Sequence, residues 1–212
     1  DPNDKNLKEI IKKTKAKITD YTKIIANFNL KIPGRHNIKN AKTAMAVAKI
    51  LNIGEKEASK SLNNFSGAWR RFEYKGETKN GVIVYDDYGH HPTEIKATLK
   101  GAREFFGDKK IWCVFQPHLY SRTKLLLKDF GKSFGDADEI ILADIYAARE
   151  PKDKSINSKI LAEEIIKKGN KAKYMESFDK ITDFLFENTK KGDVVITMGA
   201  GDIFKVGESM II

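Results

Sequence analysis

The stretch that decides the fold reads Val84-Tyr85-Asp86-Asp87-Tyr88-Gly89-His90-His91-Pro92-Thr93-Glu94-Ile95. An apolar run that starts at Val82 ends here in two carboxylates, an aromatic residue, a glycine and two histidines. Pro92 and Glu94 predict that a helix begins at this point, because proline suits the first turn of a helix and an acid suits its positive end. The polar cluster is therefore expected at the carboxyl end of a strand, where open α/β sheets bind ligands.

From residue 72 onward, short apolar runs alternate with segments of helical periodicity. This alternation predicts βαβ units and an α/β domain with a Rossmann-like, doubly wound and mostly parallel sheet. The expected strands are 82–86, 111–115, 139–144, about 172–175 and 193–198. The expected helices are 92–106, 121–134, 157–168, 177–189 and 202–208.

The first part of the chain shows a different pattern. Helices are predicted at 5–17, 38–52 and 55–64, and an extended segment at 24–32. The stretch Ser66–Arg71 has the composition of a linker, so a domain boundary is placed there. The sequence begins with a polar segment and without an initiator methionine, which predicts a fragment of a longer protein.

Composition limits the class of protein. Hydrophobic residues make up 41% and charged residues 32% of the 212 residues, which is typical of a soluble globular chain. No apolar run approaches the roughly 20 residues that cross a bilayer, so no membrane association is expected. The single cysteine, Cys113, excludes an internal disulfide and a cysteine-based zinc site, and it is predicted to be a buried core thiol.

The net charge is +10, and 33 of the 39 basic residues are lysines spread along predicted helix faces. We interpret the lysines mostly as solvated surface. The six arginines are the better candidates for anion ligands, because a guanidinium group forms a planar fork that matches phosphate and carboxylate oxygens.

Polar clusters fall where this architecture would place a binding site. The first is His36–Asn40, at the start of a predicted helix, where Asn37 and Asn40 share one face. Paired amides can read a purine edge, since each amide both donates and accepts. The alternative is that Asn37 is a helix N-cap.

Arg70 and Arg71 form a second cluster at the domain boundary, where two guanidinium groups can clamp phosphates or make an interdomain salt bridge. The third cluster is Asp86–His91. Its carboxylates can hold ribose hydroxyls or a metal, and its histidines can bind a substrate or move a proton. The alternative for this cluster is an ordinary hydrogen-bonded turn.

The fourth cluster, Phe115–Thr123, follows the next predicted strand, so it is expected to form a crevice with the third cluster. Ser121 is a candidate helix cap there, with Arg122 in the first turn. Weaker candidates are Met198–Asp202, a glycine-rich turn, and Asp144–Glu150. The chain contains no P-loop, no dinucleotide-binding glycine motif after the first predicted strand and no serine nucleophile elbow.

Taken in order, these motifs closely resemble the Mur ligase family, and within it the members that add L-alanine to UDP-N-acetylmuramate. The resemblance runs from about residue 33 to the end. It implies that residues 1–66 are the tail of the central ATP-binding domain and that residues 67–212 are the carboxyl-terminal Rossmann-like domain.

The resemblance also implies the chemistry. ATP phosphorylates the lactyl carboxylate of UDP-N-acetylmuramate, the amine of L-alanine attacks the acyl phosphate, and ADP and phosphate leave, with Mg²⁺ as the metal. This is a cytoplasmic bacterial step of peptidoglycan synthesis, needed for cell wall, cell shape and division. The P-loop and most magnesium ligands would lie outside this chain, so no metal ligand is assigned to it. The chain alone is expected to be inactive.

Residue roles follow from the resemblance. The expected nucleotide contacts are His36, Asn37 and Asn40 on the adenine, Arg70 and Arg71 on the phosphates, and Asp87 on the ribose. The expected substrate contacts are Tyr88, His90, His118 and Arg122, and the residues expected to serve catalysis are His90, Arg122 and Asp87.

The sequence departs from the family pattern at Leu119, where many relatives have arginine, and in the short span 17–33. The nearest rival within the family is the tripeptide-recycling ligase. Phe115–His118 and the Tyr88-Gly89 pair favour the alanine-adding enzyme. The rival of another class is a nucleotide-binding or nucleic-acid-binding module. Such a module is expected to have an aromatic stacking strand, a recognition-helix signature or a basic stripe, and this sequence has none of them. The chain does not reveal an oligomeric state, and an oligomer stays open.

Overall fold

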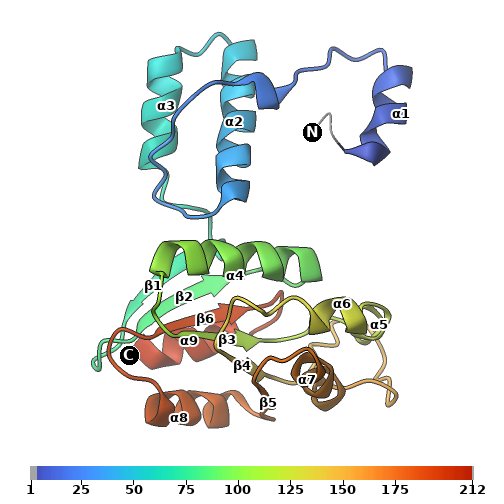
Figure 1. The fold of residues 1–212 in the computed structure, drawn as a ribbon, viewed down its shortest axis with the longest axis vertical. Helices are drawn as coiled ribbons and strands as arrows, with labels where there is room; N and C mark the ends of the chain where they lie inside the picture. Colours follow the sequence, from blue (N-terminus) through green and yellow to red (C-terminus); the bar gives the residue numbers. More distant parts are fainter. Residues whose placement is uncertain (1–3, 212) are drawn as a thin grey trace. The chain divides into compact units, whose positions relative to one another are not determined.

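A computed structural model describes residues 4–211, except for the side chain of Lys5. The chain forms two compact units that divide between Ser66 and Gly67, within the stretch predicted as a boundary (Figure 1). The assignment of these units to particular Mur ligase domains stays a prediction. No helix within residues 4–211 combines the length and the apolar character that a membrane span requires.

The first unit is helical. Its elements are α1 (Lys5–Lys13), the 3-10 turn η1 (Tyr21–Lys23), α2 (Arg35–Ile50) and α3 (Glu55–Asn64). Helices α2 and α3 pack around a small apolar cluster of Met45, Ala48 and Ala58, with Ile24, Phe28 and Leu62 against it. The expected helix at 5–17 is therefore too long, because the backbone turns to an extended conformation at Thr14.

The second unit contains a six-stranded sheet. Its strands are β1 (Glu73–Glu77), β2 (Ile83–Asp87), β3 (Ile111–Phe115), β4 (Glu139–Leu142), β5 (Ala172–Tyr174) and β6 (Val194–Met198). Their order in the sheet is β1-β2-β6-β3-β4-β5. Only β1 runs antiparallel to its neighbour, and the other five strands are parallel. The predicted mostly parallel α/β fold is confirmed.

Helices cover both faces of this sheet. They are α4 (Pro92–Phe106), α5 (Tyr120–Leu125), α6 (Leu127–Gly131), α7 (Ser158–Lys167), α8 (Phe178–Asn188) and α9 (Phe204–Ile211). Buried residues of α4, α6 and α7 belong to one core cluster, and those of α8 and α9 belong to another. Successive residues of the central strands alternate between the two clusters, so the clusters lie on opposite faces of the sheet. Figure 1 shows α4 on one side of the sheet and α8 and α9 on the other, as a doubly wound fold requires.

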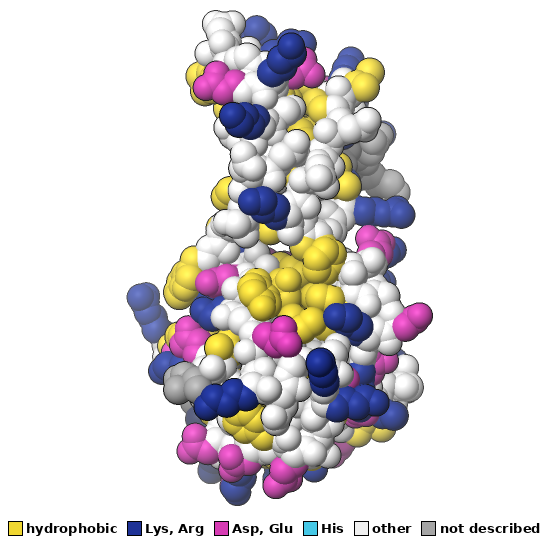
Figure 2. Space-filling model, turned by 90° about the vertical axis from the view of Figure 1, so that its left-hand side faces the viewer, with side chains coloured by type: hydrophobic (Ala, Val, Ile, Leu, Met, Phe, Trp, Pro, Cys, Tyr) yellow, Lys and Arg dark blue, Asp and Glu magenta, His cyan; other side chains and the backbone are white. Residues whose placement is uncertain are grey.

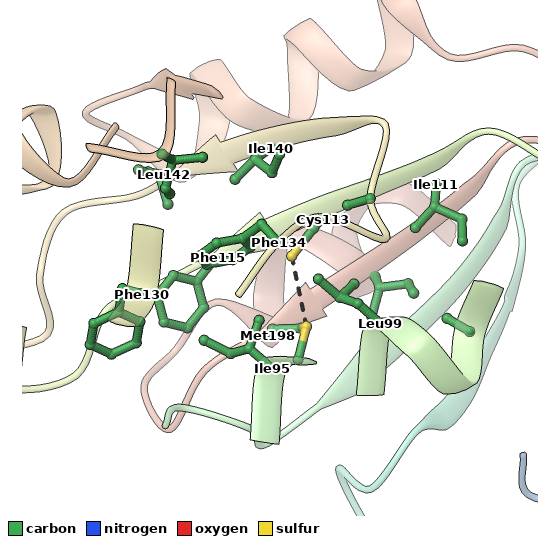
Figure 3. Packing of buried hydrophobic residues seen from close by; sticks show 14 of the residues in the cluster. Ile95, Leu99, Ile111, Cys113, Phe115, Phe130, Phe134, Ile140, Leu142 and Met198 are labelled. Carbon is green, nitrogen blue, oxygen red and sulfur yellow. Dashed lines mark hydrogen bonds between the residues drawn. The ribbon is translucent and has the colours of Figure 1, made fainter. Parts of the chain in front are cut away.

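The central strands explain why the two cores form. All five residues of β3 and all five of β6 are buried, the pattern of parallel strands that are covered on both sides. In β3, Ile111, Cys113 and Phe115 enter one core, whereas Trp112 and Val114 enter the other. The Sγ atom of Cys113 lies 3.7 Å from the Sδ atom of Met198 (Figure 3). Burial raises the pKa of the Cys113 thiol well above its usual range, so this cysteine is an inert core residue.

Two predicted features of the second unit are wrong. Strand β1 was not expected, because Glu73–Glu77 is a polar strand at the sheet edge and carries little hydrophobic signal. The helix expected at 121–134 divides into α5 and α6 at Leu126, whose backbone leaves the helical region.

Arg70 is not part of a linker, since its guanidinium group is buried inside the second unit with 3% exposure. Nε donates to Oδ2 of Asp86 at 2.6 Å, and the two terminal nitrogens donate to the carbonyl oxygens of Gly201 and Gly199 at 2.9 and 2.6 Å. The second oxygen of Asp86 accepts from the hydroxyl of Thr197 on β6 at 2.6 Å. The ion pair therefore joins the segment before β1 to β2 and to the loop after β6. It replaces the interdomain salt bridge considered for Arg70.

We predict that Arg70→Met lowers the free energy of unfolding of the second unit by about 3–5 kcal/mol, because it leaves the carboxylate of Asp86 buried without its counter-ion. Chemical denaturation monitored by tryptophan fluorescence measures this change. Lys124→Met is the control, since it breaks the exposed pair with Asp153 and is expected to cost less than about 1 kcal/mol. Equal losses in the two variants would contradict the central role of the Arg70–Asp86 pair.

Candidate functional site

The candidate site lies at the carboxyl edge of the sheet, where four strands end at the same level. In the strand register, Asp87 of β2 pairs with Met198 of β6, Met198 pairs with Phe115 of β3, and Phe115 pairs with Leu142 of β4. The loops that follow these strands therefore start side by side. Because β6 inserts between β2 and β3, the third and fourth of the clusters predicted from the sequence, Asp86–His91 and Phe115–Thr123, flank the glycine-rich turn after β6.

Asp87 is 5% exposed, and both of its carboxylate oxygens are occupied. Oδ2 accepts from the backbone N–H of Phe72 at 2.9 Å, and Oδ1 accepts from the N–H of Gly89 at 2.8 Å and from the hydroxyl of Thr98 at 3.3 Å. Burial raises the pKa of Asp87, and these donors offset part of that effect. In this structure Asp87 shapes the turn after β2, and its predicted ribose contact stays a prediction.

Glu94 and His91 organise the start of α4. The carboxylate of Glu94 accepts from the backbone N–H groups of His90 and His91 at 3.0 and 3.1 Å, and Nδ1 of His91 accepts from the N–H of Thr93. Burial opposes ionisation of Glu94, but the two N–H groups together with the nearby charges of His90 and Arg71 outweigh it, so the pKa of Glu94 is lowered. The helix starts at Pro92, as the sequence predicts, and His91 serves as its N-cap.

A row of rings crosses three of the four loops. The rings of Tyr88 and His90 pack edge to face with their centres 5.5 Å apart, and so do the rings of His90 and His118. The ring of His118 in turn stacks on that of Tyr146, with 5.7 Å between their centres. The row is held by the backbone, because the N–H of Leu119 donates to the carbonyl of Tyr146 at 2.9 Å. Three residues predicted as substrate contacts are thus brought together.

Arg122 lies beside this row in the first turn of α5. Its Nη1 is 3.2 Å from Nδ1 of His118, and it forms no ion pair with a carboxylate among residues 4–211. Burial lowers the pKa of His118, and the positive charges of His90 and Arg122 lower it further. An imidazole ring whose protonation is disfavoured therefore lies against a guanidinium group that has no carboxylate partner among residues 4–211, and this arrangement suits a carboxylate or phosphoryl ligand.

The turn that presents Arg122 is built differently from the expectation. Leu119, not Ser121, occupies the N-cap position. Its backbone φ is 73°, a value that residues other than glycine rarely adopt. The backbone N–H and hydroxyl of Ser121 instead donate to the carboxylate of Glu150 in the loop after β4. The expectation of a Ser121 cap is wrong because this long-range contact takes its hydroxyl.

Two residues of this edge were not assigned to the site from the sequence. Tyr146 lies in the stretch Asp144–Glu150, which was only a weak candidate, and Gln116 lies within the fourth motif. The position of both residues directly after a buried strand is the signal that points to them.

The two adjacent arginines have separate environments. Arg70 is fully occupied within the protein, as described above. Arg71 is exposed, its guanidinium lies 5.5 Å from the ring centre of Tyr88, and it forms no ion pair among the described residues. Of the pair, Arg71 is the residue that an anionic ligand can reach, while the predicted phosphate contact of Arg70 stays a prediction.

The remaining predicted nucleotide contacts lie in the first unit. Helix α2 begins at Arg35 after Gly34, so Asn37 lies inside the first turn and is not the N-cap. Its side-chain nitrogen donates to the carbonyl of Pro33 at 2.7 Å, and the amide of Asn40 approaches the Asn37 oxygen at 3.4 Å. The two amides share one face, as expected. A Cβ at Gly34 would lie 2.7 Å from the ring of His36, so glycine permits this close approach.

No group of three or more His, Cys, Asp or Glu side chains within the described part of the chain could hold a metal ion. Asp87 and Glu94, which flank Tyr88 and His90 in the sequence, are instead engaged by backbone N–H groups.

Comparison with known proteins supports the reading of the motifs. A family model described as "Mur ligase, glutamate ligase domain" matches residues 70–201. The chain is 49% identical over 189 residues to UDP-N-acetylmuramate–L-alanine ligase of Caldanaerobacter subterraneus, and the match covers 89% of this chain and 41% of the relative. The chain thus spans about two fifths of the length of the curated relatives that it matches first.

A relative from Clostridium botulinum with the same name is 42% identical over 235 residues, covering 98% of this chain and 51% of the relative. Since 98% of 212 residues is about 208, roughly 27 aligned positions of that relative have no counterpart here.

Solved structures point the same way. The chain superposes on UDP-N-acetylmuramate-alanine ligase MurC from Thermotoga maritima with a TM-score of 0.74 and 27% identity, covering 88% of this chain and 39% of that one. A murein peptide ligase from Psychrobacter arcticus gives a TM-score of 0.61 and 25% identity, covering 86% and 38%. On the fold, the ordered motifs and the family model, this chain belongs to the Mur ligase family.

Proposed function

We propose that the protein containing this chain is an ATP-dependent ligase that joins L-alanine to the lactyl carboxylate of UDP-N-acetylmuramate in peptidoglycan synthesis. The 49% identity to relatives with that name supports the proposal. The single observation that carries it is the row of Tyr88, His90 and His118 with the unpaired guanidinium of Arg122 beside it. These groups suit a small ligand that carries a carboxylate.

Each member of the row has a physical role in this proposal. Arg122 binds an anionic oxygen of the amino acid or the muramoyl group. Its guanidinium group is available for this contact because it has no carboxylate partner among residues 4–211. His118 is neutral near pH 7, so it orients a ligand by hydrogen bonds without repelling an attacking amine. His90 contacts the same ligand from the opposite loop, and Tyr88 limits the space.

The proposed contacts with ATP come from both units of the chain. Arg71 reaches the phosphates of ATP, and His36, Asn37 and Asn40 hold the adenine. In this proposal the magnesium ligands lie mainly in parts of the protein outside this chain. When bound, ATP would supply the phosphoryl group that activates the carboxylate, and Mg²⁺ would neutralise the charge that develops on the phosphate oxygens. The proposed location is the bacterial cytoplasm.

Two other functions are weighed against this one. The tripeptide-recycling ligase would share the fold, but the structural similarity to the murein peptide ligase is lower than to the alanine ligase, with TM-scores of 0.61 and 0.74. A nucleic-acid-binding module would present a basic stripe. On the face shown in Figure 2, lysines and arginines are interspersed with acids around a patch of apolar side chains.

The test is phosphate release from ATP in the presence of Mg²⁺, UDP-N-acetylmuramate and L-alanine. It compares this chain with a version that is extended upstream to its natural start. We expect L-alanine-dependent release from the extended version only. Release that depends on a tripeptide and not on L-alanine would favour the recycling ligase. Folded protein without either activity would contradict the ligase proposal.

We predict that Arg122→Gln in the extended protein raises KM for L-alanine or UDP-N-acetylmuramate by about 10- to 100-fold, corresponding to loss of a charge-assisted hydrogen bond of about 1.5–3 kcal/mol. Steady-state kinetics with each substrate varied in turn measures the change. Lys128→Gln is the control, because it removes the same charge from an exposed position of α6. A rise in KM for ATP alone would show that Arg122 is assigned to the wrong ligand.

We predict that His90→Gln raises the pKa of His118. Removing the neighbouring imidazole removes a positive charge that disfavours protonation of His118, so the change is upward. An NMR titration of the His118 ring in this chain follows it, starting from a wild-type pKa below the ordinary value for histidine. His91→Asn removes a histidine that lies outside the ring row and is expected to leave the titration unchanged. A His118 pKa that does not move in His90→Gln would contradict the electrostatic coupling.

A further inference from the structure

Gln116 is the first residue after β3, and its side chain has no hydrogen-bond partner among residues 4–211. The residue is 6% exposed, and its backbone N–H donates to the carbonyl of Met198 at 2.9 Å. Among the buried side-chain nitrogen and oxygen atoms of residues 4–211, Oε1 of Gln116 is the only one without a partner. The amide nitrogen has no partner there either, but it is not shut off from solvent.

This state is costly for a protein interior. A buried acceptor without a donor costs about 1–3 kcal/mol, and nearly all buried polar groups in native proteins are hydrogen-bonded. Other buried polar side chains at this edge follow the rule: Asp86, Asp87 and Thr197 each have bonds to named partners. The exception at Gln116 therefore indicates a partner that arrives with a ligand.

The surroundings of the amide place it at the ring row. A Cβ atom at Gly201 would lie 2.3 Å from Oε1 of Gln116 and 2.8 Å from Cγ of Tyr146, and one at Gly199 would lie 2.6 Å from the Gln116 carbonyl oxygen. Gly201 thus allows the loop after β6 to approach the side-chain amide of Gln116 closely, and Gly199 allows it to approach the Gln116 backbone. Tyr146 continues the contact, because its ring stacks on His118.

We propose that Gln116 is a substrate-positioning residue whose amide binds the amino acid that the ligase joins, an inference that rests on the proposed function. An amide presents one acceptor and one donor side by side, and an α-amino acid presents a donor amine beside an acceptor carboxylate. Rotation of the terminal amide exchanges oxygen and nitrogen with little steric change, so Oε1 can turn to the accessible side. The neutral Oε1 atom can accept a hydrogen bond from an N–H of the substrate amine without removing a proton from it.

The test is Gln116→Met in the protein extended to its natural start, since methionine keeps a similar shape without polar atoms. We expect KM for L-alanine to rise at least tenfold while KM for ATP stays within twofold. The melting temperature is expected to stay the same or rise, because an unpaired buried acceptor is removed. Ser158→Ala is the matched control: its buried hydroxyl donates to the carbonyl of Ala143 at 2.6 Å, so this variant should melt lower with unchanged KM values.

A second measurement uses the wild-type protein and therefore does not depend on whether a variant folds. The side-chain NH₂ signals of Gln116 in the wild-type extended protein are expected to shift when L-alanine is added with ATP and UDP-N-acetylmuramate. A lower melting temperature in Gln116→Met with an unchanged KM for L-alanine would overturn the proposal and make Gln116 a structural residue. Unchanged KM values with unshifted NH₂ signals would also overturn it. A wild-type enzyme without L-alanine turnover would instead contradict the proposed function.

Discussion

The second unit depends on one buried ion pair between Arg70 and Asp86. Its guanidinium group also binds two carbonyl oxygens of the loop after β6, and its carboxylate also binds Thr197 on β6. Charges this deeply buried are stable only when all their hydrogen-bonding groups are engaged. The pair therefore fixes three segments at once, namely the entry to β1, the end of β2 and the glycine-rich turn.

The candidate site is a consequence of that constraint and of the strand order. Because β6 comes last in the chain but lies between β2 and β3, the loop after it is bound by Arg70 and lies close to Gln116, the first residue after β3. The ring row then lies across the loops after β2, β3 and β4. A site that is shared among separate loops can change its ligand contacts without changing the core.

The two pairs of similar neighbours in the motifs show where sequence reasoning stops. Arg70 and Arg71 are the same residue type, yet one is buried in an ion pair and the other is exposed beside Tyr88. Asp86 and Asp87 point to opposite faces of β2. Asp86 accepts from the guanidinium group of Arg70, whereas Asp87 accepts from backbone N–H groups. Periodicity predicts that such neighbours diverge, but it does not show which long-range partner each one meets.

The sequence by itself determined the alternation of strands and helices, the parallel sheet, the start of α4 at Pro92 and the family, because these follow from local patterns and from the order of motifs. The edge strand β1, the break at Leu126 and the contact of Ser121 with Glu150 were decided only by the tertiary structure. The physical reason is the same in each case. These features depend on partners far apart in the chain, and such partners leave little trace in a local pattern.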